Sequence, residues 1–168
     1  SSAVGSLNNA AAAMSSGVGF NNTAMGVNSS ALGSVNMSNA ENSSAVGAGN
    51  LSNGADSSAL GRSNTAGDIN SSAVGAYNNA AAVNSSAFGN QNTANGESSS
   101  AVGFNNTSNG INSSAFGYTN RADSENSTVV GVGNNVDASA RNASAMGFSN
   151  IANGTNSSAL GNRNIANG

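Results

Sequence analysis

Serine and asparagine dominate the polar side chains of this 168-residue chain, but the groups that would make a serine nucleophilic are missing. The chain has no His, which excludes a Ser-His-Asp triad and a histidine metal site. It has no Cys, which excludes disulfides and thiolate chemistry, and no Lys, which excludes a P-loop. The sequence therefore predicts no enzyme: no catalytic residue, no cofactor-binding residue and no metal ligand.

The carboxylates are also poorly placed for chemistry. The seven acidic residues are Glu41, Asp56, Asp68, Glu97, Asp123, Glu125 and Asp137. They never recur at one position of the repeat described below, so the sequence indicates neither a glycosidase carboxylate pair nor a phased calcium-binding repeat. Asp56 replaces Asn at the start of a repeat and is interpreted as a turn residue. The net charge is −3 and the four Arg are dispersed, which disfavours binding to nucleic acid.

A glycine at a fixed interval is the strongest pattern in the sequence. It recurs every 14 residues from Gly5 to Gly131, and then at Gly147 and Gly161 after steps of 16 and 14 residues. We call these the motif glycines and number the other positions of each unit relative to them. The surrounding phrase is Asn-Ser-Ser-Ala-Leu-Gly or a close variant, as at 28–33 and 156–161. So short and regular a unit predicts an ordered repeat, although 37% apolar residues alone would suggest a low-complexity segment.

The length of the unit selects the type of repeat. Fourteen residues cannot hold two packed helices, and a glycine in each unit would cost a helix about 1 kcal/mol. Two short strands of about 4 to 5 residues joined by tight turns fit well. Stacked coils of this kind form parallel strands about 4.8 Å apart. The sequence therefore predicts an all-β parallel β-roll, a solenoid of about twelve 14-residue coils that occupies residues 1–168 as one repeat domain.

Two polar positions are explained by this roll. We expect each motif glycine to end a strand at a turn, with a positive φ that a Cβ would penalise. The residue at position +3 is Asn in every unit. Asn tolerates left-handed turn geometry, and in-register Asn side chains at strand spacing form amide ladders; the position fits either role, and we favour the ladder. Ser at position −3 is expected to form a similar hydroxyl column. The turn and ladder residues assigned in this way include Gly33, Gly47, Gly75, Asn36, Asn50 and Asn78.

Position −1 is always a large apolar residue, and position −2 is almost always Ala. Neighbouring side chains point to opposite faces of a strand, so one column fills the roll and the other faces outward. The sequence leaves open whether the large column is core or interface. This apolar column includes Val46, Leu60, Val74, Phe88, Val102 and Phe116. Either arrangement gives a thin roll with little buried surface, so we expect obligate association of parallel chains around a shared axis.

The aromatic residues gather between positions −1 and +2. This group includes Phe104, Tyr118 and Phe148. One interpretation is that they pack against a neighbouring subunit, and the other is that they form a ligand-binding strip. The 16-residue step between Gly131 and Gly147 is the single lapse in the period and a second place to look for binding.

The phrase Asn-Ser-Ser-Ala-Val-Gly, followed by Asn at +3 and a small residue at +5, resembles the head repeat of YadA-like trimeric autotransporter adhesins. The resemblance covers the whole chain and is best kept at 42–47, 70–75, 84–89, 112–117 and 156–161. It implies a left-handed parallel β-roll, a homotrimer and display at the bacterial cell surface, above a stalk and outer-membrane anchor outside this sequence. The family includes units of both 14 and 16 residues.

Two function classes follow from these observations. The first is an adhesin head that attaches a bacterium to extracellular-matrix protein, abiotic surfaces or other cells. The alternative is a passive structural rod or spacer that presents another binding domain. The sequence predicts no cofactor in either case, and the expected partners are the chain itself, as a homotrimer, and a matrix protein or surface ligand.

Overall fold

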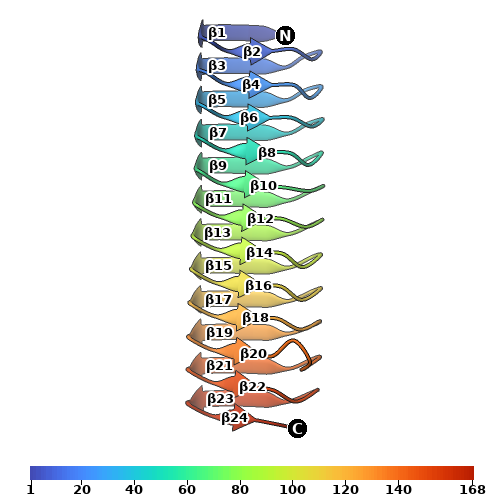
Figure 1. The fold of residues 1–168 in the computed structure, drawn as a ribbon, viewed down its shortest axis with the longest axis vertical. Coiled ribbons are helices and arrows are strands. Elements are labelled where there is room, and N and C mark those ends of the chain that lie inside the picture. Colours follow the sequence, from blue (N-terminus) through green and yellow to red (C-terminus); the bar gives the residue numbers. More distant parts are fainter.

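The structure, a computed structural model that describes all residues 1–168, is a straight rod of stacked coils (Figure 1). Each coil contains one five-residue strand and one two-residue strand. The long strands are β1 (Ser2–Ser6), β3 (Ser16–Phe20), β5 (Ser30–Ser34), β7 (Ser44–Ala48), β9 (Ser58–Arg62), β11 (Ser72–Ala76), β13 (Ser86–Asn90), β15 (Ser100–Phe104), β17 (Ser114–Tyr118), β19 (Thr128–Val132), β21 (Ser144–Phe148) and β23 (Ser158–Asn162). This architecture confirms the predicted parallel β-solenoid.

The second strand of each coil is shorter than the 4 to 5 residues that we expected. The short strands are β2 (Asn9–Ala10), β4 (Thr23–Ala24), β6 (Met37–Ser38), β8 (Leu51–Ser52), β10 (Thr65–Ala66), β12 (Asn79–Ala80), β14 (Thr93–Ala94), β16 (Thr107–Ser108), β18 (Arg121–Ala122), β20 (Asn135–Val136), β22 (Ile151–Ala152) and β24 (Ile165–Ala166). The chain leaves the sheet early because it folds into a wide outer turn. In this turn the amide of Ser71 donates to the carbonyl of Asp68 at 3.1 Å, and Asn70 has a left-handed φ of 56°.

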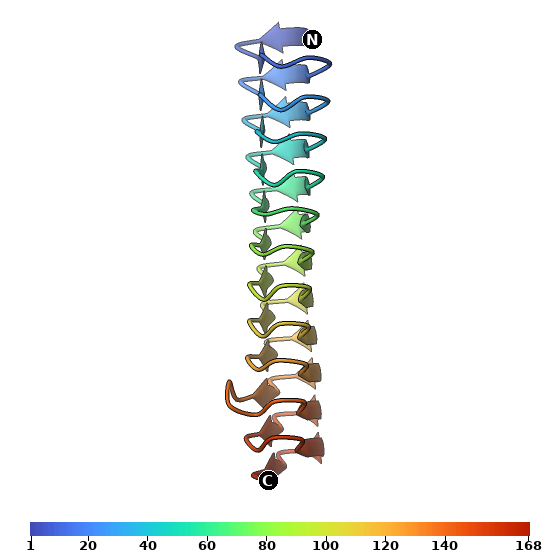
Figure 2. The same ribbon diagram turned by 90° about the vertical axis from the view of Figure 1, so that its right-hand side faces the viewer.

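The strands form two parallel 12-stranded sheets, one of long strands and one of short strands. The register is exact from coil to coil, so that Val46 pairs with Leu60 and Gly47 with Gly61. The longer unit does not disturb it, because Val130 still pairs with Met146. The two additional residues are accommodated in the turn between β20 and β21, where the chain extends beyond the turns of the other coils (Figure 2).

The apolar part of the interior is made almost entirely of alanine, and Ser38, Ser52 and Ser108 take the same inward position as alanine in three coils. Position −2 of the long strand and position +5 of the short strand both point inward, and residues such as Ala73 and Ala80 have no exposed surface. One coil carries Val129 and Val136 at these positions instead, both fully buried. Two sheets separated only by methyl groups must lie close together, so the core of a single chain has no space for large side chains.

The motif glycines lie within the long strands and have φ between 111° and 120°. A Cβ on Gly75 would overlap the carbonyl oxygen of Gly89 in the next coil. The positive φ is as expected, but the glycine is the fourth of five strand residues and does not itself make the turn. The turn follows two residues later, where Tyr77 has a φ of 58°. The glycine is needed mainly because adjacent backbones approach closely there.

The ordered elements are all strands, and the protein has no helix long and apolar enough to cross a membrane. This agrees with the prediction from the length of the unit that the repeat is not helical.

The close approach at the motif glycine predicts a severe effect of Gly75→Ala. Its Cβ would collide with the backbone of Gly89 at a positive φ, so we expect at least about 1–3 kcal/mol of destabilisation, measured by thermal unfolding. The matched control is Gly67→Ala, where a Cβ would lie an ordinary 3.4 Å from the Cα of Ala81. Equal melting temperatures for the two variants would contradict this explanation.

Candidate binding surface

The invariant Asn at position +3 forms a continuous ladder inside the rod. Asn78 Nδ2 donates to Asn64 Oδ1 at 3.0 Å, to the carbonyl of Val74 at 3.0 Å and to that of Gly89 at 2.7 Å. Its Oδ1 accepts from both the backbone N and the Nδ2 of Asn92, each at 3.0 Å. Every interior coil repeats this arrangement, in which one side chain links three successive coils.

This ladder cannot be reached by an outside ligand. Asn36, Asn50 and Asn78 are buried, as is each Asn of the column from Asn22 to Asn150. The motif glycines Gly33, Gly47 and Gly75 contribute carbonyl groups to the same network: Gly47 accepts from Asn36 Nδ2 at 2.8 Å. These residues build the scaffold and leave binding to the surface columns.

Most of the buried serines lie at position −4, for which no role was predicted. Ser57 Oγ donates to the carbonyl of Gly54 at 2.6 Å and closes the outer turn, and Ser113 does the same with Gly110 at 2.7 Å. The expected hydroxyl column at position −3 does not form, because residues such as Ser58 lie half-buried on the opposite side of the strand. The recurrence of Ser at position −4 in nearly every unit could have indicated this role from the sequence.

The structure places the large residue of position −1 on the outer face of the long-strand sheet. Val46 and Leu60 are each 37% exposed in the single chain, while the intervening Ala positions are fully buried. Phe88 and Phe116 are exposed to a similar degree, and Val74 and Val102 are half-buried. This answers the question that the sequence left open: in one chain alanine is the core, and the apolar column faces outward.

The outward apolar surface is wider over β15, β17, β19 and β21. In these strands the residue at position +1, on the same face, is also large: Phe104, Tyr118, Val132 and Phe148 are all exposed. The rings of Phe104 and Tyr118 stack with centroids 5.3 Å apart and planes 9° from parallel. The Arg163 guanidinium lies 5.8 Å from the ring of Phe148. The three aromatic candidates therefore lie in one column beside the apolar column, with Phe104 and Tyr118 in contact and Val132 between Tyr118 and Phe148.

A second amide ladder follows the exposed outer turn and was not predicted. Asn28 Nδ2 donates to Asn42 Oδ1 at 3.1 Å, and Asn42 Nδ2 donates to Asp56 Oδ1 at 2.9 Å. Asp56 has a left-handed φ of 57°, which confirms its interpretation as a turn residue. Asparagine suits this position because it tolerates left-handed geometry and still carries a donor and an acceptor.

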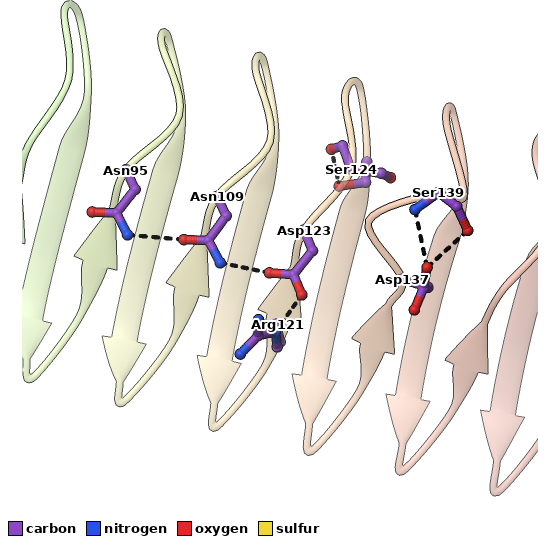
Figure 3. A network of polar contacts seen from close by, with 8 residues as sticks. Asn95, Asn109, Arg121, Asp123, Ser124, Asp137 and Ser139 are labelled. Atoms are coloured by element: carbon purple, nitrogen blue, oxygen red, sulfur yellow. Dashed lines mark hydrogen bonds and ion pairs between the residues drawn. The ribbon is translucent and has the colours of Figure 1, made fainter.

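The 16-residue unit has its own polar contacts (Figure 3). Asp137 accepts from the backbone N of Ser139 at 3.0 Å and from its Oγ at 2.8 Å. Both hydrogen bonds, the backbone one above all, favour the ionised carboxylate and lower the pKa of Asp137 below its ordinary value. In the preceding coils Asn95 donates to Asn109 at 2.9 Å, and Asn109 donates to Asp123, which is paired with Arg121.

The longer turn packs back onto the rod. Ala140 is fully buried, and its carbonyl accepts from Ser124 Oγ of the preceding coil at 2.6 Å. Arg141 Nη2 lies 3.3 Å from Glu125 Oε2. The insertion is thus a folded part of the scaffold with its own surface shape. The rod has no pocket and no cluster of three potential metal ligands.

The model of the YadA head domain repeat, which spans two copies of the repeat, matches this chain five times. The matches cover residues 24–50, 52–78, 80–106, 108–134 and 138–164. Each therefore corresponds to two coils of the rod, and the last includes most of the longer unit. Among curated proteins no significant match is found.

The ladder geometry predicts a large effect of Asn78→Ala. The substitution removes the side chain that bonds to the backbone N of Asn92 and to the carbonyl of Gly89. Each buried group left without a partner should lower the free energy of unfolding by about 1–3 kcal/mol. Urea unfolding of the variant measures the loss. Asn79→Ala is the matched control, since the neighbouring Asn79 side chain is only half-buried and outside the ladder. A comparable loss in the control would contradict the special role of the ladder.

The contacts of Asp137 predict a titration that side-chain NMR can follow. Because its folded pKa is lowered, the carboxylate favours the folded state above the ordinary pKa, and this contribution is lost as pH falls through the folded pKa. Ser139→Ala should raise the pKa of Asp137 only part of the way, since the backbone N–H still donates. If the pKa of Asp137 does not rise in Ser139→Ala, the hydrogen bond from the Ser139 hydroxyl has no influence on the carboxylate.

Proposed function

The chain belongs to the YadA head domain family, and from this premise we propose that it is the head of a trimeric adhesin that attaches a bacterium to a surface ligand. The proposed ligands are a host extracellular-matrix protein, an abiotic surface or another cell. We also propose that the coil is left-handed, that three parallel chains associate, and that the head is displayed at the cell surface and held to the outer membrane by an anchor outside residues 1–168.

The outward apolar column is the main observation that supports the proposed trimer. Large apolar side chains follow one face of the rod coil after coil, while the apolar residues of the closed core are alanine and, in one coil, valine. Contiguous exposed apolar surface of this kind marks an interaction site, because each large side chain gains about 1.5–3 kcal/mol when it is fully buried. Association of three such faces supplies the core that a single coil lacks.

The proposed adhesive surface lies among the irregular exposed positions. The buried ladder and the alanine core are shared by all coils, so they cannot distinguish one ligand from another. The 16-residue turn varies from the other turns, and so do the exposed residues at position +2, such as Ser63, Gln91 and Thr119. A rod without a pocket suits a broad contact with a large ligand better than capture of a small molecule.

The alternative is a passive rod that presents another binding domain. It is favoured by the unbroken Asn ladder, which continues through the longer unit with Asn150 Nδ2 donating to Asn134 Oδ1 at 2.9 Å. A continuous ladder of this kind stiffens the rod, and stiffness is the only property that a spacer requires. Replacement of residues 1–168 in the full-length surface protein by an unrelated rod of equal length separates the adhesin from the spacer. If the head is the adhesin, the bacterium loses attachment. If the head is only a spacer, attachment is retained.

The exposed apolar column predicts that Val74→Asp prevents trimer formation without disturbing the roll. Three carboxylates brought to one interface would be desolvated and would repel one another. Light scattering should show a trimer for the parent chain, independent of concentration, and smaller species for the variant. Ile69→Asp is the control, since Ile69 is exposed on the outer turn, away from this face. A stable, folded monomer of the parent chain would contradict the trimer.

A further inference from the structure

The outward face of the long-strand sheet is uniform at one position and irregular at another. Position −1 is apolar in every coil, whereas position +1 changes from Ala48 and Arg62 to Asn90, then to four large apolar residues, and then to Asn162. We call the wide region the apolar block. It consists of Phe104, Phe116, Tyr118, Val130, Val132, Met146 and Phe148, all exposed in the single chain.

A uniform apolar column specifies where two rods meet but not at what height. If one rod moves along another by one coil, about 4.8 Å, each residue at position −1 again faces a residue at position −1. Only the contact of a terminal coil is lost. Register is weakly specified wherever a repetitive face pairs with itself, so trimers of a perfect repeat would include slipped forms.

The apolar block removes this degeneracy. Its four rows at position +1 are bounded by Asn90 on β13 and Asn162 on β23. When two copies lie at equal height, apolar rows face apolar rows. A slip of one coil brings Phe104 to the level of a partner's Asn90, or Phe148 to the level of Asn162, and leaves one large apolar side chain beside an amide.

We propose that the apolar block docks against the same block of a second copy of this chain and thereby sets the axial register of the subunits. The proposal rests on the proposed trimer and adds a specific role for Phe104, Tyr118, Val132 and Phe148. Unequal rows perform the function that a single polar core position performs in coiled coils, where one irregular residue selects the register.

A second copy fits this surface better than another partner does. The block is continuous with the apolar column on the same strands, so whatever covers that column also reaches the block. The seven block residues include no charged side chain. Phe104 and Tyr118 stack with their planes 9° from parallel, so each ring turns one face toward the other and that face cannot receive a planar ligand. An apolar surface without a pocket is suited to the matching surface of a second copy.

Disulfide trapping tests the proposal, since the chain has no Cys of its own. Two differently tagged chains are co-expressed, one with Val46→Cys and the other with Val74→Cys, which lie two coils apart on the outward column. These two cysteines approach each other only when one subunit is displaced by two coils, which sets two rows of the apolar block outside the partner's block. A pair that carries Val46→Cys in both chains reports on aligned subunits. We expect at least ten-fold more product from the aligned pair than from the offset pair.

The decisive variant combines Phe104→Thr, Tyr118→Thr, Val132→Thr and Phe148→Thr. Threonine keeps the strand propensity, and all four side chains point away from the core, so the roll should still fold. The offset product should rise several-fold in this variant. Phe20→Thr, an exposed aromatic at position +1 outside the block, is the matched control and should leave the ratio unchanged.

The outcomes separate this proposal from the one on which it rests. A monomer in light scattering contradicts both. A trimer whose offset product is equally rare with and without the four threonines overturns the role in register and retains the trimer. Nitration of Tyr118 provides the second measurement: protection in the trimer relative to the Val74→Asp variant supports docking between copies. Equal nitration would show that the block stays open to a ligand and would overturn the proposal.

Discussion

The buried asparagine ladder is the interaction on which the rest of the structure depends. Its amide groups satisfy backbone carbonyls that face the interior where the chain turns, and they link each coil to the coils before and after it. Buried amides are tolerated only when they are fully bonded, and a column of identical side chains at strand spacing meets this condition. The glycine at each motif belongs to the same constraint, because only a residue without Cβ allows the backbones to approach closely enough for Asn Nδ2 to reach the next coil.

The thin interior follows from this closure and determines the outside. Two sheets held that close leave room for alanine or serine and, in one coil, valine. The large apolar residues that the chain does carry are consequently on the outer face, where they are available to a partner. The scaffold thus uses nearly all of its regular positions for stacking, and the variable positions around it are left for recognition. The proposed trimer and the proposed register both arise from this division between regular and irregular columns.

Much of the fold was predictable because the period is short. A 14-residue unit excludes helices, and the columns of Gly, Asn and Ala are visible in the sequence without any structure. The errors were local. The second strand is only two residues long, the turn follows the motif glycine by two residues, and the buried hydroxyls are at position −4, as in Ser57. These details depend on the path of the outer turn, which alternation of side chains along a strand does not describe.

The sequence by itself determined the repeat, the parallel stacking and the family, because the spacing of identical residues permits few architectures. It also brought the aromatic residues to one part of the unit. Only the tertiary structure decided which face of the long strand is core. Alternation states that Ala73 and Val74 point in opposite directions, and the choice between them depends on the distance between the two sheets. That distance is limited by the short connection between the two strands of a coil, as between Ala76 and Asn79, and by the hydrogen bond from Asn78 Nδ2 to the carbonyl of Val74 across it. The Asn side chain reaches this position because it is held in the ladder by the coils before and after it, which is a property of stacked coils and not of any single unit.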